Sequence, residues 1–146
     1  ESGQLTITQG DVADHDAVYD YLLDLTKREQ LKEVAFDSWS AIHLTSRLTD
    51  AGLPMVRYDQ SMKSMSPASK EAEVLIRSKT LHHLGKPFYG WCFNNCEVYT
   101  DANDNIKVRK GPDPALKIDP IIAMIMAIGR ATANLEKPKK FSFYMD

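Results

Sequence analysis

The chain has 146 residues, of which 43% are hydrophobic and 26% are charged, and its formal net charge is −2. This composition is typical of a globular domain that buries a core, and it argues against a disordered chain. The charge balance gives no global signature of a nucleic-acid-binding protein, so any contact with nucleic acid must come from local basic patches. No run approaches the roughly 20 apolar residues of a membrane span, and the polar start lacks a signal-peptide core, so we expect no membrane partner.

In the first half of the chain, short strand patterns alternate with helix patterns. Residues 5–8 alternate apolar and polar side chains as a strand does, and residues 14–29 carry the single apolar stripe of a helix. A buried strand over 32–36, a helix over 38–50 that ends at Gly52, and a strand over 55–58 follow. Two strands separated by a helix predict a parallel pair joined by a right-handed crossover.

The second half is predicted to hold a helix, a hairpin and a closing helix. Ser66 followed by Pro67 indicates the start of a helix that ends near Ser78. Residues 88–100 are rich in aromatic and branched side chains, and a polar turn at 101–105 leads into 106–109, which predicts a hairpin. The helix over 118–134 is apolar on almost all sides and should be buried. These elements need more sheet than residues 5–8 supply, so we expect further strands before Glu1.

Two carboxylates are the candidate metal ligands. Asp37 ends the apolar run in Glu33-Val-Ala-Phe-Asp37-Ser-Trp39, where α/β folds present an acid at the carboxyl edge of a sheet. Asp119 opens the last helix, so the two acids could converge on one cation. Each acid also has a structural explanation, because Asp37 could cap the helix that follows it and an Asp before a Pro is a common helix start.

Cysteine and histidine give weaker signals. If Cys92 and Cys96 lie on one strand, they are about 13 Å apart, too far for a disulfide or for joint ligation of a metal, and we interpret them as reduced. The histidines His43, His82 and His83 could suggest zinc, but no pair spaced by four residues with a Glu accompanies them, and zinc is therefore disfavoured.

Basic side chains on the predicted hairpin are the candidate contacts to DNA. Lys107, Arg109 and Lys110 could follow a phosphate backbone, which predicts binding that weakens with salt and does not depend on sequence. The ordinary alternative for such a run is a solvated surface. Trp39 and Trp91 are interpreted as core residues and not as platforms for stacked bases.

The order and spacing of five segments resemble the nuclease domain of the large terminase subunit of tailed bacteriophages, which has a ribonuclease-H-like fold. The segments cover residues 33–39, 52–60, 66–71, 86–91 with Asn95, and 117–130, the last beginning Lys117-Ile-Asp119-Pro. The resemblance implies an α/β fold with a central mixed sheet flanked by helices and a β-hairpin insertion. Residues 1–146 would then form a single truncated domain whose N-terminal strands lie before Glu1.

The resemblance also implies a function. In that family three acids bind divalent cations; Asp37 and Asp119 match the second and third, and the first is expected on a strand before Glu1. The implied activity is an endonuclease that cuts concatemeric viral DNA by phosphodiester hydrolysis, with two Mg²⁺ or Mn²⁺ ions held by hard carboxylate oxygens. The implied partners are double-stranded DNA, a small terminase subunit and a portal protein, in the cytoplasm of the host.

Two further expectations follow from the same residues. The ATPase activity of a terminase should belong to an upstream domain, because this chain has no Gly-x-x-x-x-Gly-Lys-Ser/Thr loop. The alternative to an endonuclease is a module of the same fold that binds DNA or a packaging partner without cutting, since two acids without the third could hold metal too weakly for turnover. An upstream strand that ends in Asp would favour the enzyme.

Overall fold

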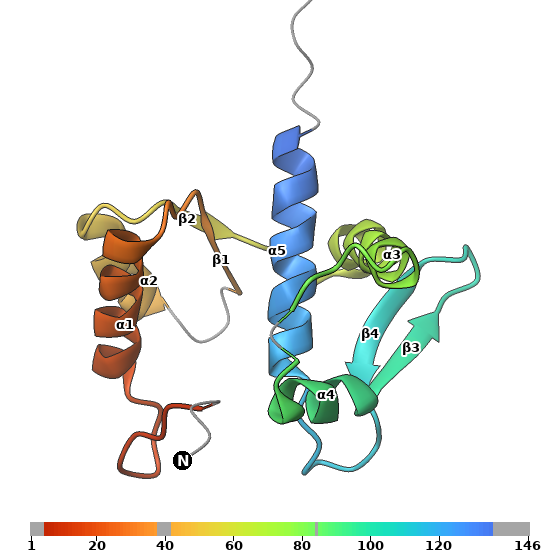
Figure 1. The fold of residues 1–146 in the computed structure, drawn as a ribbon, viewed down its shortest axis with the longest axis horizontal. Coiled ribbons are helices and arrows are strands. Elements are labelled where there is room, and N and C mark those ends of the chain that lie inside the picture. The colour runs from red at the N-terminus through yellow and green to blue at the C-terminus, as the bar shows by residue number, and fades with distance from the viewer. Residues whose placement is uncertain (1–4, 38–41, 84, 136–146) are drawn as a thin grey trace, which may run out of the picture.

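The computed structural model describes residues 5–37, 42–83 and 85–135. Helix α5 stands between two groups of elements, with α1, α2, β1 and β2 on one side and α3, α4, β3 and β4 on the other (Figure 1). The elements in chain order are α1 His15–Arg28, β1 Val34–Phe36, α2 Ile42–Asp50, β2 Met55–Arg57, α3 Met62–Arg77, α4 Pro87–Asn94, β3 Cys96–Thr100, β4 Ile106–Lys110 and α5 Asp119–Leu135.

Helix α1 begins and packs as its sequence predicts. Asp14 caps it, because its Oδ1 accepts hydrogen bonds from the backbone N–H groups of Asp16 and Ala17 at 3.1 and 2.9 Å. Its apolar stripe packs on a small core that includes α2, formed by Leu44, Leu48 and Leu53 together with Tyr19, Leu22, Leu23, Val34 and Met55. Helix α1 contributes no fully buried residue, so it covers this core from outside.

Strands β1 and β2 form the predicted parallel pair. Val34 lies opposite Met55, and α2 connects the two strands. Gly52, at a φ of +88°, follows the end of α2 in the left-handed conformation that glycine adopts without strain. The predicted strand at 5–8 is wrong, because this segment has no regular structure. Ile7 is 90% exposed, so the alternation of apolar and polar residues in this segment does not reflect one buried face.

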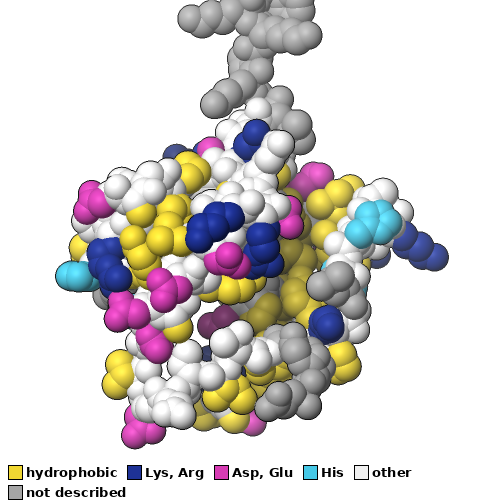
Figure 2. Space-filling view, turned by 60° about the vertical axis from the view of Figure 1, so that its left-hand side comes forward, with side chains coloured by type: hydrophobic (Ala, Val, Ile, Leu, Met, Phe, Trp, Pro, Cys, Tyr) yellow, Lys and Arg dark blue, Asp and Glu magenta, His cyan; other side chains and the backbone are white. Residues whose placement is uncertain are grey.

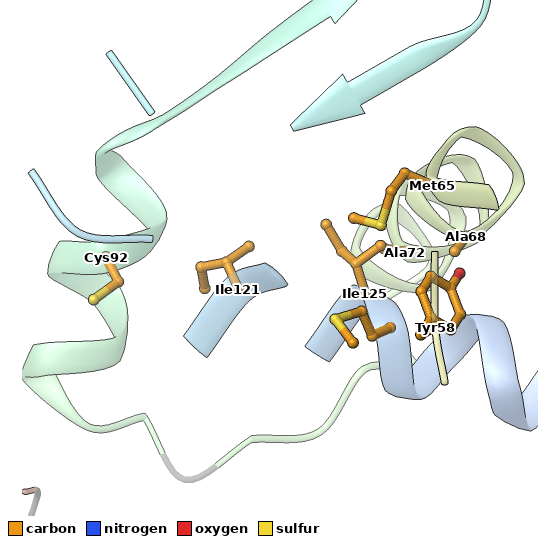
Figure 3. Packing of buried hydrophobic residues seen from close by; sticks show 8 residues of the cluster. Tyr58, Met65, Ala68, Ala72, Cys92, Ile121 and Ile125 are labelled. Carbon is orange, nitrogen blue, oxygen red and sulfur yellow. The ribbon is translucent and has the colours of Figure 1, made fainter. Parts of the chain in front are cut away.

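The larger core lies between α3, α4 and α5 (Figure 3). Small side chains on α3 let α5 approach closely, and larger ones fill the space around them. The close approach requires Gly129, because an added Cβ would collide with the Tyr58 hydroxyl and lie 3.0 Å from the Ala68 Cβ. The buried members of this core are Tyr58, Met65, Ala68, Ala72, Cys92, Ile121, Ile125 and Met126.

Helix α3 starts earlier than predicted. The sequence places its start at Ser66 and Pro67, whereas the helix begins at Met62 and contains Pro67. Met65 is fully buried, so packing favours extending the helix toward its N-terminus. Pro67 is exposed, and the Lys63 carbonyl that it leaves without a helical partner can be solvated on that face.

The predicted strand over 88–100 is half wrong, because its first part is helix α4. Pro87 occupies the first turn, and Phe88, Tyr89 and Cys92 have the spacing of one helix face against the larger core. Cys92 and Cys96 therefore do not share a strand; the Cys96 thiol donates to the Cys92 carbonyl at 3.4 Å. Both cysteines are free thiols, as predicted.

Strands β3 and β4 form the predicted antiparallel hairpin. The Asp101 side chain closes its turn by accepting hydrogen bonds from the backbone of Asn103 and Asn105. The prediction of one central mixed sheet is wrong for the described residues, which form two separate two-stranded sheets. The physical reason is that α3 and α5 lie between β1–β2 and the hairpin (Figure 1). Within the same residues, no helix combines the length and apolarity needed to cross a membrane.

Candidate metal and DNA site

The strand that carries Asp37 is fastened to α5 at its other end. Glu33, just before β1, accepts two hydrogen bonds from Arg130 of α5, from Nε at 2.6 Å and from Nη2 at 3.0 Å. The side chains of Arg130 and Glu33 are only 29% and 22% exposed. Such a two-point contact between planar groups fixes both position and orientation. It therefore sets the position of β1 along α5.

From this contact, the strand and the helix lead toward the two candidate acids in the same direction. From Glu33 the strand advances about 13 Å to Asp37. From Arg130 the helix runs back about 16 Å to Asp119. In Figure 1, β1 descends toward the end at which α5 begins. Asp37 and Asp119, which are far apart in sequence, therefore lie near the same end of the contact between β1 and α5.

A cavity of about 580 Å³ lies between α1, β1 and α5, and Asp37 lines it together with Ala123, Ala127 and Arg130. Asp119 precedes Ala123 by four residues and Ala127 by eight, so it belongs to the same stripe of α5 as these two lining residues. Figure 2 shows the molecule hollowed between its two sides, with mainly apolar side chains along the hollow. Asp37 thus borders a recess, and Asp119 opens the helix that forms one wall of it.

Among the described residues, the Asp119 side chain accepts no hydrogen bond that would cap α5. The first turn of α5 is closed by the Ile118 carbonyl, which accepts from the backbone N–H groups of Ile121 and Ile122 at 2.9 and 3.1 Å. No hydrogen bond among the described residues uses the carboxylate of Asp119 or of Asp37. The segment that Asp37 was predicted to cap, residues 38–41, lies outside the described residues.

The donor set suits a hard divalent cation but is small. Mg²⁺ binds through one or two carboxylates and completes its shell with water and substrate phosphate oxygens, so Asp37 and Asp119 are ligands of a suitable type. Between residues 5 and 135, with the gaps given above, no group of three or more His, Cys, Asp or Glu side chains is placed to hold a metal ion. Asp37 and Asp119 therefore fit a Mg²⁺ or Mn²⁺ site that other ligands must complete.

The three hairpin cations do not form one free basic face. Lys107 is half-buried and donates to the Gln60 carbonyl at 2.6 Å. Arg109 pairs with Glu97, Nη2 to Oε2 at 3.5 Å, and lies over the Tyr99 ring. Lys110 projects from the opposite face of β4, because side chains alternate along a strand.

Helix α4, whose residues were predicted as part of a strand, lies beside the start of α5. Cys92 of α4 packs in the same core as Ile121 of α5, and the pKa of its thiol is raised first by burial and then by the charge of Asp119. Trp91 of the same helix is 44% exposed and stacks near Phe88 at a ring distance of 5.9 Å, so its prediction as a core residue is wrong. Trp39 lies outside the described residues. The signal for α4 was Pro87, which commonly opens a helix.

Sequence comparisons match almost the whole chain. The family model described as the endonuclease domain of the terminase large subunit covers residues 1–135. Protein YmfN of Escherichia coli K12 is 33% identical over 132 residues, which are 90% of this chain and 29% of YmfN. The terminase large subunit of Enterobacteria phage HK97 is 29% identical over 135 residues, 91% of this chain and 27% of that protein. The chain thus spans less than a third of the length of these relatives.

Solved structures show the same fold. The crystal structure of the HK97 large terminase superposes with a TM-score of 0.73 and 28% identity over 84% of this chain and 26% of that one. The large terminase nuclease from thermophilic phage G20c gives a TM-score of 0.62 over 84% of this chain and 64% of that one, and at 16% identity it supports the fold alone. From the family match and these structures, the chain belongs to the family of terminase large-subunit endonuclease domains.

Proposed function

We propose that this chain is the DNA-cutting part of a terminase large subunit, a divalent-metal-dependent endodeoxyribonuclease that cuts concatemeric viral DNA during packaging. The observation that carries the proposal is the two-point contact between Glu33 and Arg130, which fastens the strand before Asp37 to the helix that opens with Asp119. Membership of the family supports the same activity.

Asp37 and Asp119 would hold the metal ions as ionised carboxylate ligands and would not transfer protons. Two bound Mg²⁺ or Mn²⁺ ions would supply an activated water and stabilise charge on the leaving oxygen. The other contribution of this chain would be to position the ligands: β1 and α5 would hold the two carboxylates in place before DNA binds. The third acid of the family would come from a segment before Glu1.

The biological setting is part of the proposal. The substrate would be double-stranded DNA, and packaging would involve a small terminase subunit and a portal protein in the cytoplasm of the host. ATP hydrolysis would belong to another domain of the full-length protein. The support for this setting is the family to which the chain belongs.

Plasmid nicking by the full-length protein tests the proposal. Asp37→Asn and Asp119→Asn remove a negative ligand with little change in shape, so each should abolish cleavage in Mg²⁺ and in Mn²⁺ while the protein stays folded. Asp50→Asn is the matched control, because Asp50 is an exposed acid at the end of α2 and should not affect cleavage. Substantial cleavage by both active-site variants would refute the assignment of the ligands.

The second candidate function is a module that binds DNA or a packaging partner without cutting. The observation in its favour is that, among the described residues, no group of three or more His, Cys, Asp or Glu side chains is placed to hold a metal ion. This alternative predicts salt-sensitive DNA binding with no cleavage in any divalent metal, even by the full-length protein.

A further inference from the structure

A second recess, of about 420 Å³, lies beside the start of α5. Its polar side chains are His82, His83 and Lys86, and among the described residues no acid lines it. Pro120 forms part of its wall and directly follows Asp119 in the chain, so the recess adjoins the candidate metal site. Its lining is Leu81, His82, His83, Gly85, Lys86, Phe88, Tyr89, Pro120 and Met124, which we name the His83–Lys86 groove.

His83 is held in a defined orientation in this groove. Its Nδ1 accepts a hydrogen bond from the backbone N–H of Gly85 at 3.0 Å, and its ring stacks on Tyr89 with centroids 5.4 Å apart. Tyr89 is itself anchored, because its hydroxyl donates to the Met124 sulfur of α5 at 2.7 Å. Since Nδ1 accepts, the ring carries its hydrogen on Nε2, and His83 offers this N–H as a donor.

Lys86 places a positive charge at the start of α4. Its carbonyl accepts from the backbone N–H groups of Tyr89 and Gly90, which fixes its backbone, while its side chain is exposed. Within the described part of the chain the Lys86 ammonium makes no ion pair. The groove therefore joins a fixed donor with a mobile cation.

We propose that the His83–Lys86 groove binds backbone phosphates of the DNA strand that is cut. The charge argues for this occupant, since Lys86 and two imidazole side chains line the groove with no acid beside them among its described lining residues. The apolar walls formed by Phe88, Tyr89 and Pro120 suit the sugar and base of a nucleotide, which pack on aromatic surfaces. This proposal deepens the proposed nuclease function and rests on it.

The location of the groove has an electrostatic reason. Asp37 and Asp119 repel a phosphodiester that approaches before metal binds, so a strand must be attracted by cations beside the acids. The hairpin cations are poorly suited to this task, because Lys107 and Arg109 already have partners within the protein. The groove adjoins Asp119 through Pro120, and its lysine, Lys86, is not engaged in an ion pair among the described residues.

The test measures DNA affinity of the full-length protein in EDTA over a series of salt concentrations. Lys86→Glu should weaken binding of a duplex by at least tenfold and lower the salt slope by about 0.9 for each phosphate that the groove no longer neutralises. Lys63→Glu is the matched control: Lys63 is an exposed lysine of α3, the net charge changes equally, and affinity should stay near that of the wild type. His83→Ala should weaken binding further when combined with Lys86→Ala.

The outcomes separate this proposal from the nuclease assignment. Equal affinity and salt slope for Lys86→Glu and Lys63→Glu would overturn the groove as a DNA site, whatever the Asp37→Asn and Asp119→Asn variants show. If Lys86→Glu loses binding to a free mononucleotide but keeps the DNA affinity of the wild type, the groove is a nucleotide pocket and the proposal of a DNA site is overturned. Weaker DNA binding only in the groove variants, in a protein that cuts no DNA in any metal, would keep the groove and refute the nuclease.

Discussion

The ion pair between Glu33 and Arg130 should stabilise the domain more than any exposed pair on it. Exposed pairs contribute about 0 to 1 kcal/mol, whereas breaking a fully buried pair costs about 3 to 5 kcal/mol. These two side chains are 22% and 29% exposed and meet in a bidentate contact. Arg130→Ala should therefore lower the free energy of unfolding by about 2 kcal/mol, between these limits.

Chemical and thermal unfolding measure this change directly. For a domain of this size a change of about 2 kcal/mol corresponds to a fall in Tm of roughly 4 to 8 °C. Arg77→Ala is the matched control, because the pair of Arg77 with Glu73 on α3 has side chains 78% and 49% exposed and should be worth less than about 0.5 kcal/mol. Equal destabilisation by Arg130→Ala and Arg77→Ala would refute the reasoning.

The same pair should also affect activity, because it sets where β1 lies along α5. Arg130→Lys keeps the charge but loses the fork geometry of the guanidinium, so Asp37 should shift relative to Asp119. The expected result is a higher Mn²⁺ concentration for half-maximal cleavage, with DNA affinity in EDTA unchanged. A double-mutant cycle with Glu33→Gln isolates the pair, and a coupling free energy near zero would contradict its assigned role.

Two further predictions concern the larger core. Gly129→Ala gains about 1 kcal/mol of helix propensity, but it forces a Cβ against the Tyr58 hydroxyl at a cost of about 1 to 3 kcal/mol. We therefore expect the variant to be less stable in urea unfolding, and Tyr58→Phe to restore part of the lost stability. A Gly129→Ala variant more stable than the wild type would contradict the close packing. Burial raises the pKa of the Cys92 and Cys96 thiols, so fewer thiolates form at pH 8. Iodoacetamide should therefore react more slowly with the folded protein than with the protein in urea. Equal reaction rates would contradict the raised pKa values. Since these pKa values are higher when folded, their contribution to stability is complete below the ordinary thiol pKa and is lost as pH rises through the raised values.

Several elements follow from local sequence alone. Asp14 and the apolar stripe behind it specify α1, and the apolar run after Asp119 specifies α5, because capping and the helical period act between near neighbours. The polar turn around Asp101 specifies the hairpin for the same reason. The two acids could also be picked out, since a strand that ends in Asp37 and a helix that opens with Asp119 are local patterns.

Other features depended on contacts between distant parts of the chain. Helix α3 extends past Ser66 to Met62 because Met65 is buried against other elements, and residues 88–94 are helical because one face of α4 packs on α5. The contacts of Lys107 and Arg109 also depend on the tertiary structure, because their partners, Gln60 and Glu97, lie on another loop and another strand.

The sequence by itself determined the elements that short-range periodicity and capping encode, the parallel β1–β2 crossover, and the identity of the two candidate acids. Only the tertiary structure decided that the strand before Asp37 is fastened to the helix that opens with Asp119, and that the His83–Lys86 groove lies beside the start of that helix. The physical reason is that Glu33 and Arg130, which fix β1 against α5, are 97 residues apart, and no local pattern encodes an interaction across that separation.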